Sequence, residues 1–161
     1  MKIGLLLLGV LALALGGCTS SPAAPKLETA LTWEAPNAER VACNELLAEW
    51  SDGEQGSPQG CWRYLAGYNS AEPKRAQFAS FIEYVGVKPD VEPVCVAGSV
   101  SCMAIWKTSD GYLWLSSGIN IEGLKQRLDN PGAADLVHEL LVYTGDTDPG
   151  AGSIVEWEPL D

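Results

Sequence analysis

An apolar tract at the N-terminus, Ile3–Leu15, constrains this chain more than any other feature of its sequence. Lys2 precedes the tract, and a pair of glycines follows it. A positive residue, an apolar core and small residues in this order are typical of an export signal. A transmembrane helix needs about 20 apolar residues, and this tract ends after about 15. Residues 1–17 are therefore predicted to be a signal peptide that is removed, and the rest of the chain is predicted to fold after export.

The residues at the predicted cleavage point, Leu15-Gly16-Gly17-Cys18, resemble the lipobox of bacterial lipoproteins. The resemblance implies that Cys18 carries lipid, palmitate included, and becomes the first residue of the mature protein. Two or more acyl chains anchor a protein stably, at about 0.8 kcal/mol for each buried methylene. Thr19 stands where the lipoprotein family associates aspartate with retention in the inner membrane. We expect an exported protein anchored to the cell membrane or outer membrane; a secreted protein without lipid is the alternative.

The charge of the chain limits its partners. Asp and Glu number 21 against 10 Lys and Arg, a formal net charge of −11, which becomes −12 once Lys2 is removed with the signal peptide. An acidic domain repels nucleic acid and anionic lipid head groups. We therefore expect no nucleic-acid partner, and membrane attachment only through the lipid on Cys18.

Four cysteines remain besides Cys18, an even number in an exported chain, which predicts two disulfides. Sequence alone allows three pairings. We favour Cys43 with Cys61 and Cys95 with Cys102, because each bond closes a short local loop. A zinc site built from the four thiolates is the alternative, but the chain lacks the C-x-x-C spacing of such sites.

The mature chain of about 140 residues has the size of one domain with one core. Residues 18–32 are small, polar and proline-containing, which predicts a flexible tether. We place a single globular domain over residues 33–161, beginning at Trp33.

The apolar periodicity predicts an α+β fold, with a small antiparallel sheet covered by helices. The Ser109-Asp110-Gly111 sequence indicates a hairpin turn between two of the strands. Asn130-Pro131 is a good helix start, with asparagine as the cap. The predicted helices are 38–50, 73–85, 122–128 and 130–144, and the predicted strands are 91–97, 102–108 and 112–116.

His138, the only histidine, is followed by Glu139 in an otherwise apolar run. In zinc peptidases the helical pattern H-E-x-x-H places two histidines on one helix face, where they bind zinc while the glutamate activates water. Here Val142 occupies the second histidine position and cannot bind a metal. His138 and Glu139 are therefore candidates only for a vestigial catalytic pair.

The flanking residues extend this likeness, because a predicted hairpin precedes the run and Gly145-Asp146-Thr147-Asp148 follows it. The segment from about Tyr112 to Trp157 resembles the C-terminal part of small exported zincin-like bacterial proteins. In such proteins a third ligand, commonly histidine, lies about where Ala151 stands. The resemblance implies a zincin-like fold, and the departures at Val142 and Ala151 imply a lost zinc site. We expect no metal and no other cofactor.

Two alternatives stay open for this motif. A zinc-dependent peptidase with a non-standard ligand set would have to recruit Asp146 or Asp148, since a catalytic zinc needs three protein ligands. Without any kinship to peptidases, His138 would be a hydrogen-bonded structural residue and Glu139 a solvated one.

Two further features suggest binding sites. Asp146, Asp148 and Gly150 alternate as in a calcium loop. However, Trp157 stands where the bidentate glutamate of such a loop would lie, so a stabilised turn is the simpler interpretation.

Six tryptophans could form a platform for ligands, although core packing is the interpretation we favour. The sequence therefore predicts a lipid-anchored envelope protein with a zincin-like binding or structural domain that is not an enzyme.

Overall fold

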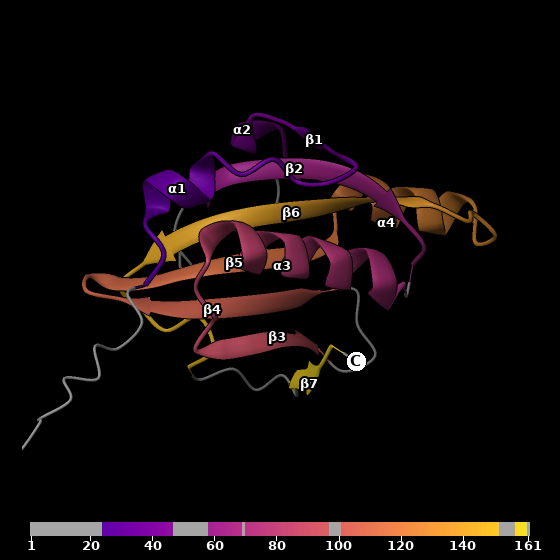
Figure 1. The fold of residues 1–161 in the computed structure, drawn as a ribbon. Helices are drawn as coiled ribbons and strands as arrows, with labels where there is room; N and C mark the ends of the chain where they lie inside the picture. Colours follow the sequence, from indigo (N-terminus) through magenta and orange to yellow (C-terminus); the bar gives the residue numbers. More distant parts are fainter. Residues whose placement is uncertain (1–23, 47–57, 69, 97–100, 152–156, 161) are drawn as a thin grey trace, which may run out of the picture.

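The computed structural model describes residues 24–46, 58–68, 70–96, 101–151 and 157–160. Eleven elements lie within these residues and are labelled in Figure 1. The helices are α1 (Leu27–Leu31), α2 (Cys43–Leu46), α3 (Ala71–Val85) and α4 (Ile121–Asp129). The strands are β1 (Ala38–Arg40), β2 (Pro58–Ala66), β3 (Val91–Val96), β4 (Cys102–Thr108), β5 (Gly111–Ile119), β6 (Leu136–Gly145) and β7 (Trp157–Pro159).

The seven strands form one sheet in the order β1-β2-β6-β5-β4-β3-β7, and every neighbouring pair is antiparallel. The predicted α+β class with an antiparallel sheet is confirmed. β3, β4 and β5 correspond to the three predicted strands and form an antiparallel meander, in which residues 109–110 make the predicted turn between β4 and β5. Gly111 follows this turn with φ 134°, and any Cβ there would collide with the backbone of Gly145 on β6.

The long helix α3 lies across one face of the sheet, in front of β4, β5 and β6 in Figure 1. We call this side the helical face. Side chains alternate between the two faces of a strand. The main hydrophobic core lies on the helical face. There, Phe78 and Phe81 of α3 and Ala30 of α1 join the buried side chains of the strands. Its strand members are Trp62, Tyr64, Ala66, Cys102, Ala104, Trp106, Leu113, Leu115, Leu140 and Val142.

On the opposite face of the sheet, the shorter helices α2 and α4 pack against the strands. α2 packs Leu46 against Cys61 of β2 and Leu141 of β6. α4 lies so close to β6 that a Cβ on Gly123 would collide with the backbone carbonyl of Val137. Gly150, beyond the end of β6, lies beside Ile105 of β4.

The predicted helix over residues 130–144 is wrong, because Leu136–Gly145 is the strand β6. β6 lies between β2 and β5, and most of its side chains are buried on both faces. A strand buried on both faces is a continuous apolar run, which periodicity alone does not distinguish from a buried helix. The apolar run therefore does not distinguish a helix from a strand. Pro131 and Gly132 form a turn, closed by a hydrogen bond from the Ala133 amide to the Asn130 carbonyl.

The structure differs from the prediction at three other places in the N-terminal half of the chain. The predicted helix 38–50 is replaced by β1 and α2, and its last four residues lie outside the described residues. The strand β2, which contains Cys61, is absent from the predicted strands. The predicted tether contains α1, whose Ala30 is 0% exposed, so the structured part begins before Trp33. The predicted signal peptide, 1–17, and Cys18 lie outside the described residues.

Both favoured disulfides are present, Cys43 with Cys61 and Cys95 with Cys102. The first joins α2 to β2, with 5.2 Å between the Cα atoms. The second joins directly opposite residues of β3 and β4. The four-thiolate zinc site is therefore ruled out in this oxidised form. The predicted helix 73–85 is also confirmed, and Gly86 ends it in the left-handed conformation with φ 68°.

Candidate functional site: a buried polar cluster beneath α3

His138 lies on β6 with its side chain on the helical face, where it is 0% exposed. The directly opposite residue on β2 is Tyr64, and the two ring centroids are 5.3 Å apart at an angle of 34°. Neither ring nitrogen of His138 has a hydrogen-bond partner among the described residues. The only imidazole of the chain is thus sealed inside the protein with unsatisfied polar atoms.

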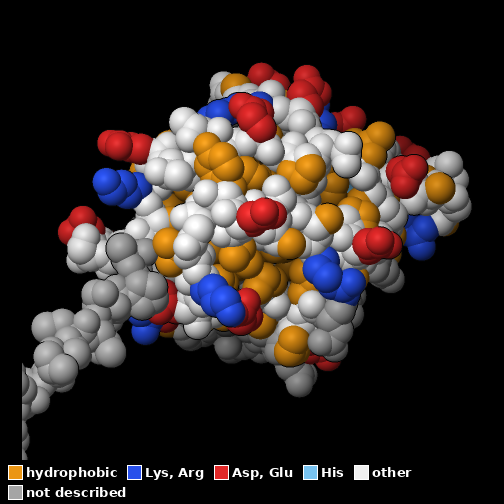
Figure 2. Space-filling view, in the orientation of Figure 1, with side chains coloured by type: hydrophobic (Ala, Val, Ile, Leu, Met, Phe, Trp, Pro, Cys, Tyr) orange, Lys and Arg blue, Asp and Glu red, His pale blue; other side chains and the backbone are white. Residues whose placement is uncertain are grey.

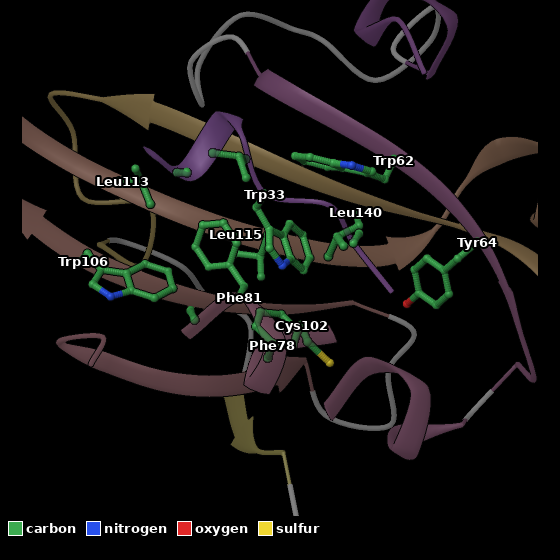
Figure 3. Close-up of a cluster of buried hydrophobic side chains, with 14 of the residues drawn as sticks. Trp33, Trp62, Tyr64, Phe78, Phe81, Cys102, Trp106, Leu113, Leu115 and Leu140 are labelled. Carbon is green, nitrogen blue, oxygen red and sulfur yellow. The ribbon is translucent and has the colours of Figure 1, made fainter. Parts of the chain in front are cut away.

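Tyr64 forms the best-defined polar contact of this region. Its hydroxyl and the Ser117 hydroxyl on β5 are 2.6 Å apart, and Ser117 is 0% exposed. Burial raises the pKa of Tyr64 to about 12, although the hydrogen bond to Ser117 acts in the opposite direction. Figure 3 shows Tyr64 at the end of the core that lies away from Trp106. The polar cluster therefore occupies one end of the helical face.

α3 contributes Lys74 and Gln77, which are 2% and 4% exposed. The Gln77 side-chain amide donates a hydrogen bond of 2.6 Å to the Pro36 carbonyl, while its Oε1 atom has no partner. Burial lowers the pKa of Lys74 below its usual range. We define the polar cluster as Tyr64, Lys74, Gln77, Ser117 and His138.

Electrostatics keep His138 uncharged at neutral pH. Burial, followed by the charge of Lys74, lowers the pKa of His138 from 6.5 to about 4. The backbone carbonyls of Ala66 and Gly67 favour the protonated ring, but their geometry falls short of a hydrogen bond to either nitrogen. The polar cluster combines one cation with neutral groups and contains no carboxylate.

Glu139 points to the other side of the sheet, because neighbouring residues of a strand face opposite ways. It pairs with Arg63 on β2 and Gly118 on β5. Burial raises the pKa of Glu139 to about 7. Its Oε2 atom and Nε of Arg63 are both buried without a hydrogen-bond partner. Since His138 and Glu139 lie on opposite faces of the sheet, their side chains cannot act together on one zinc-bound water in this structure.

The other residues of the zincin comparison do not join His138. Val142 is 0% exposed in the main core, and on a strand it lies about 13 Å along from His138. Asp148 Oδ1 accepts a hydrogen bond of 2.9 Å from the Gly150 amide, in the turn that also contains Ala151. The described part of the chain holds no group of three or more His, Cys, Asp or Glu able to share a metal ion. The zincin-like fold is not supported, and Asp146 to Gly150 behaves as a stabilised turn.

Four of the six tryptophans are core residues. Trp33, Trp62, Trp106 and Trp114 are at most 3% exposed, and Trp114 stacks on Tyr143 with 5.2 Å between ring centroids. Trp50 and the side chain of Trp157 lie outside the described residues. These four indoles therefore stabilise the fold and offer no exposed platform.

The sequence prediction missed Tyr64, Ser117, Lys74 and Gln77. A signal for Lys74 was present, since it precedes Phe78 and Phe81 at helical spacing and so stands on the apolar stripe of α3. Lysine in such a position is almost never buried unless it has a partner. Tyr64 and Ser117 had no comparable signal, because their contact depends on β2 and β5 flanking β6.

No protein family, curated protein or solved structure matches this chain. None of the helices in the described ranges combines the length and apolar character that a membrane span requires.

Proposed function

We propose that this protein is an exported lipoprotein of the bacterial cell envelope whose folded part is a non-catalytic binding or structural domain. The observation that carries the proposal is how the five cysteines divide between the two disulfides and the lipobox-like sequence. Four of them form the two disulfides, and the fifth, Cys18, lies outside the described residues. Cys18 is also the residue at which the lipobox-like sequence would place the lipid.

The disulfides support the export step of this proposal. Structural disulfides persist in the periplasm and at cell surfaces and are rare in the bacterial cytosol. Both bonds also fit the fold, since one secures α2 on β2 and the other links paired strands. A chain that depends on such bonds needs an oxidising compartment, which the signal-like residues 1–17 would provide.

The burial of His138 supports a role in binding or structure over peptidase catalysis. A peptide bond cannot reach an imidazole that is 0% exposed beneath α3. Glu139, the other residue of the motif, faces the far side of the sheet. We therefore assign no peptidase role to this pair, and the membrane is the partner that the proposal names.

The test of the anchor is the mass of the N-terminal peptide. The full chain, expressed in a bacterium that lipidates its own lipoproteins, should appear in the membrane fraction with its first residue at Cys18 and an added acyl mass. Cys18→Ser should carry no acyl mass and should be mislocalised. The matched control is the double variant Cys95→Ser and Cys102→Ser, which also removes cysteines but should keep the lipid. An unmodified Cys18 in the mature protein would contradict the proposal.

The non-catalytic assignment has its own measurement. The oxidised protein, purified without a histidine tag, should contain substoichiometric zinc by atomic emission. Stoichiometric zinc retained after dialysis would contradict this part of the proposal without touching the lipid anchor.

A further inference from the structure

A cleft of about 710 Å³ lies beside Ala24, the first residue that the structure describes. Its walls are the segment 24–28, which leads into α1, and the β4–β5 hairpin, with Thr144 from the end of β6. In Figure 1, α1 and the turn of this hairpin lie at one end of the sheet and α4 lies at the other. Ligand-binding clefts have volumes of about 300–1,000 Å³. The cleft therefore has room for a small organic group.

Part of the lining is apolar. Pro25 and Leu113 are buried, and Leu27 and Tyr112 are half-buried. Leu27 also packs against the main core, so this wall is held in place from inside the domain. The apolar lining favours a ligand with a hydrocarbon part.

The exposed part of the lining carries both signs of charge. Lys26, Glu28 and Asp110 all border the cleft, and all three are exposed. The Ser109 hydroxyl donates a hydrogen bond of 3.1 Å to Oδ2 of Asp110, which helps to orient this carboxylate at the turn. A ligand that complements one ammonium and two carboxylates has a negative group and a positive group of its own.

The short connection to Cys18 places the cleft close to the proposed lipid anchor. The chain is fixed to the domain from Pro25 onwards, since Pro25 is buried and Ala30 of α1 is 0% exposed. Ala24, on the wall of the cleft, follows Cys18 by six residues, which span at most about 22 Å. A lipid on Cys18 would therefore keep this end of the domain next to the membrane surface.

We propose that the cleft binds the headgroup of a zwitterionic membrane phospholipid, phosphatidylethanolamine. Lys26 takes the phosphate, Asp110 and Glu28 take the ammonium, and Leu27 contacts the glycerol ester region. A primary ammonium donates hydrogen bonds to carboxylates, and such charge-assisted bonds are the strong ones. Anionic lipids fit less well, because the domain is acidic. The membrane as the source of this ligand rests on the proposed function.

The cleft can be tested apart from the anchor with a short-chain lipid. The mature chain 18–161 carrying Cys18→Ser would be exported from a cleavable signal peptide and purified oxidised. Dihexanoyl phosphatidylethanolamine, kept below its micelle-forming concentration, would be titrated while backbone amide signals are followed by NMR. We expect saturable shifts at residues 108–113 and none on α4, and at least tenfold weaker binding of dihexanoyl phosphatidylglycerol.

Two variants test the charges. Lys26→Met and Asp110→Asn should each weaken binding at least fivefold, whereas Lys125→Met and Asp129→Asn, the same changes at exposed positions of α4, should bind like the parent. Shifts that grow only linearly, equal binding of the anionic lipid, or unchanged affinity in both cleft variants would overturn the proposal. Equally tight binding of free phosphoethanolamine would overturn the membrane lipid as the ligand.

The anchor and the cleft can fail separately. Saturable binding of the short-chain lipid together with an unmodified Cys18 would support the cleft and contradict the lipid anchor. An acyl mass on Cys18 without saturable binding would support the anchor and overturn the cleft proposal.

Discussion

The core beneath α3 has two ends that differ in how their polar atoms are satisfied. At one end Phe81 packs against Trp33 and Trp106, with ring centroids 5.0 and 5.4 Å apart. The indole N–H of Trp33 donates to Ser80 and that of Trp106 to the Val87 carbonyl, so Trp62 is the indole there without a hydrogen bond. At the other end His138 is equally buried, and neither of its ring nitrogens has a hydrogen-bond partner among the described residues.

The same helix and the same sheet build both ends, so the difference comes from a few side chains. Phe78 and Phe81 belong to the aromatic end (Figure 3), whereas Lys74 and Gln77 precede them on α3. The exposed side of the molecule shown in Figure 2 carries no visible histidine, in keeping with this burial. We infer that the aromatic end supplies stability and that the polar end costs stability.

The largest effect is expected at the aromatic end. Phe81→Ala should lower the free energy of unfolding by about 3–5 kcal/mol, because it removes a large buried side chain and leaves a cavity between two tryptophans. Chemical unfolding followed by tryptophan fluorescence measures this. Leu128→Ala, at a residue that is 79% exposed, is the control and should change stability by less than about 0.5 kcal/mol. Similar losses in both variants would mean that the aromatic end is not the main core.

The second prediction concerns pH, because His138 and Glu139 respond to it in opposite directions. The pKa of His138 falls from 6.5 to about 4, so its stability contribution is complete above pH 6.5 and is lost as the pH falls towards 4. The pKa of Glu139 rises from 4.5 to about 7, so its contribution is complete below pH 4.5 and is lost as the pH rises towards 7. Each amounts to about 3 kcal/mol, and together they nearly cancel.

Single variants should show the pH dependence of stability that each of the two residues causes by itself. Urea unfolding of His138→Phe should show stability falling as pH rises from 4.5 to 7, since only the Glu139 effect remains. Glu139→Gln should show stability rising with pH from 4 to 6.5, since only the His138 effect remains. If both variants kept the pH profile of the parent protein, these two side chains would not be buried in the way described.

The third prediction concerns the polar end directly. Lys74→Met in low-salt buffer should raise the free energy of unfolding by about 1–2 kcal/mol, because it replaces a buried ammonium, whose pKa is lowered by burial, by an apolar side chain of similar length. Thermal and chemical unfolding both report the change. The matched variant Lys88→Met, at an exposed position, should have no comparable effect. A large loss of stability in Lys74→Met would show that the ammonium has a strong partner in the folded protein.

The smallest effect is expected at the Tyr64–Ser117 hydrogen bond. Tyr64→Phe should cost about 1 kcal/mol, because it leaves the Ser117 hydroxyl buried without a partner. The double variant Tyr64→Phe with Ser117→Ala should recover part of this loss, since neither orphaned hydroxyl remains. Strictly additive losses in the double variant would indicate that the two hydroxyls do not interact.

The sequence alone determined the elements whose signals are local. Gly86 ends α3, Ser109 and Asp110 turn the β4–β5 hairpin, and the near-neighbour cysteines pair as their spacing suggested. Each of these depends on residues close together in the chain. The meander and α4 were predictable for the same reason.

Tertiary structure decided the rest. β6 is a strand because β2 and β5 flank it and bury both of its faces, a fact that its own apolar residues do not encode. That one change separated His138 from Glu139 and removed the helix face on which a zinc motif depends. It also brought His138 next to Tyr64, 74 positions earlier in the chain, where the charge of Lys74 on α3 helps to lower the pKa of His138. Only the packing of distant segments could place a polar cluster there.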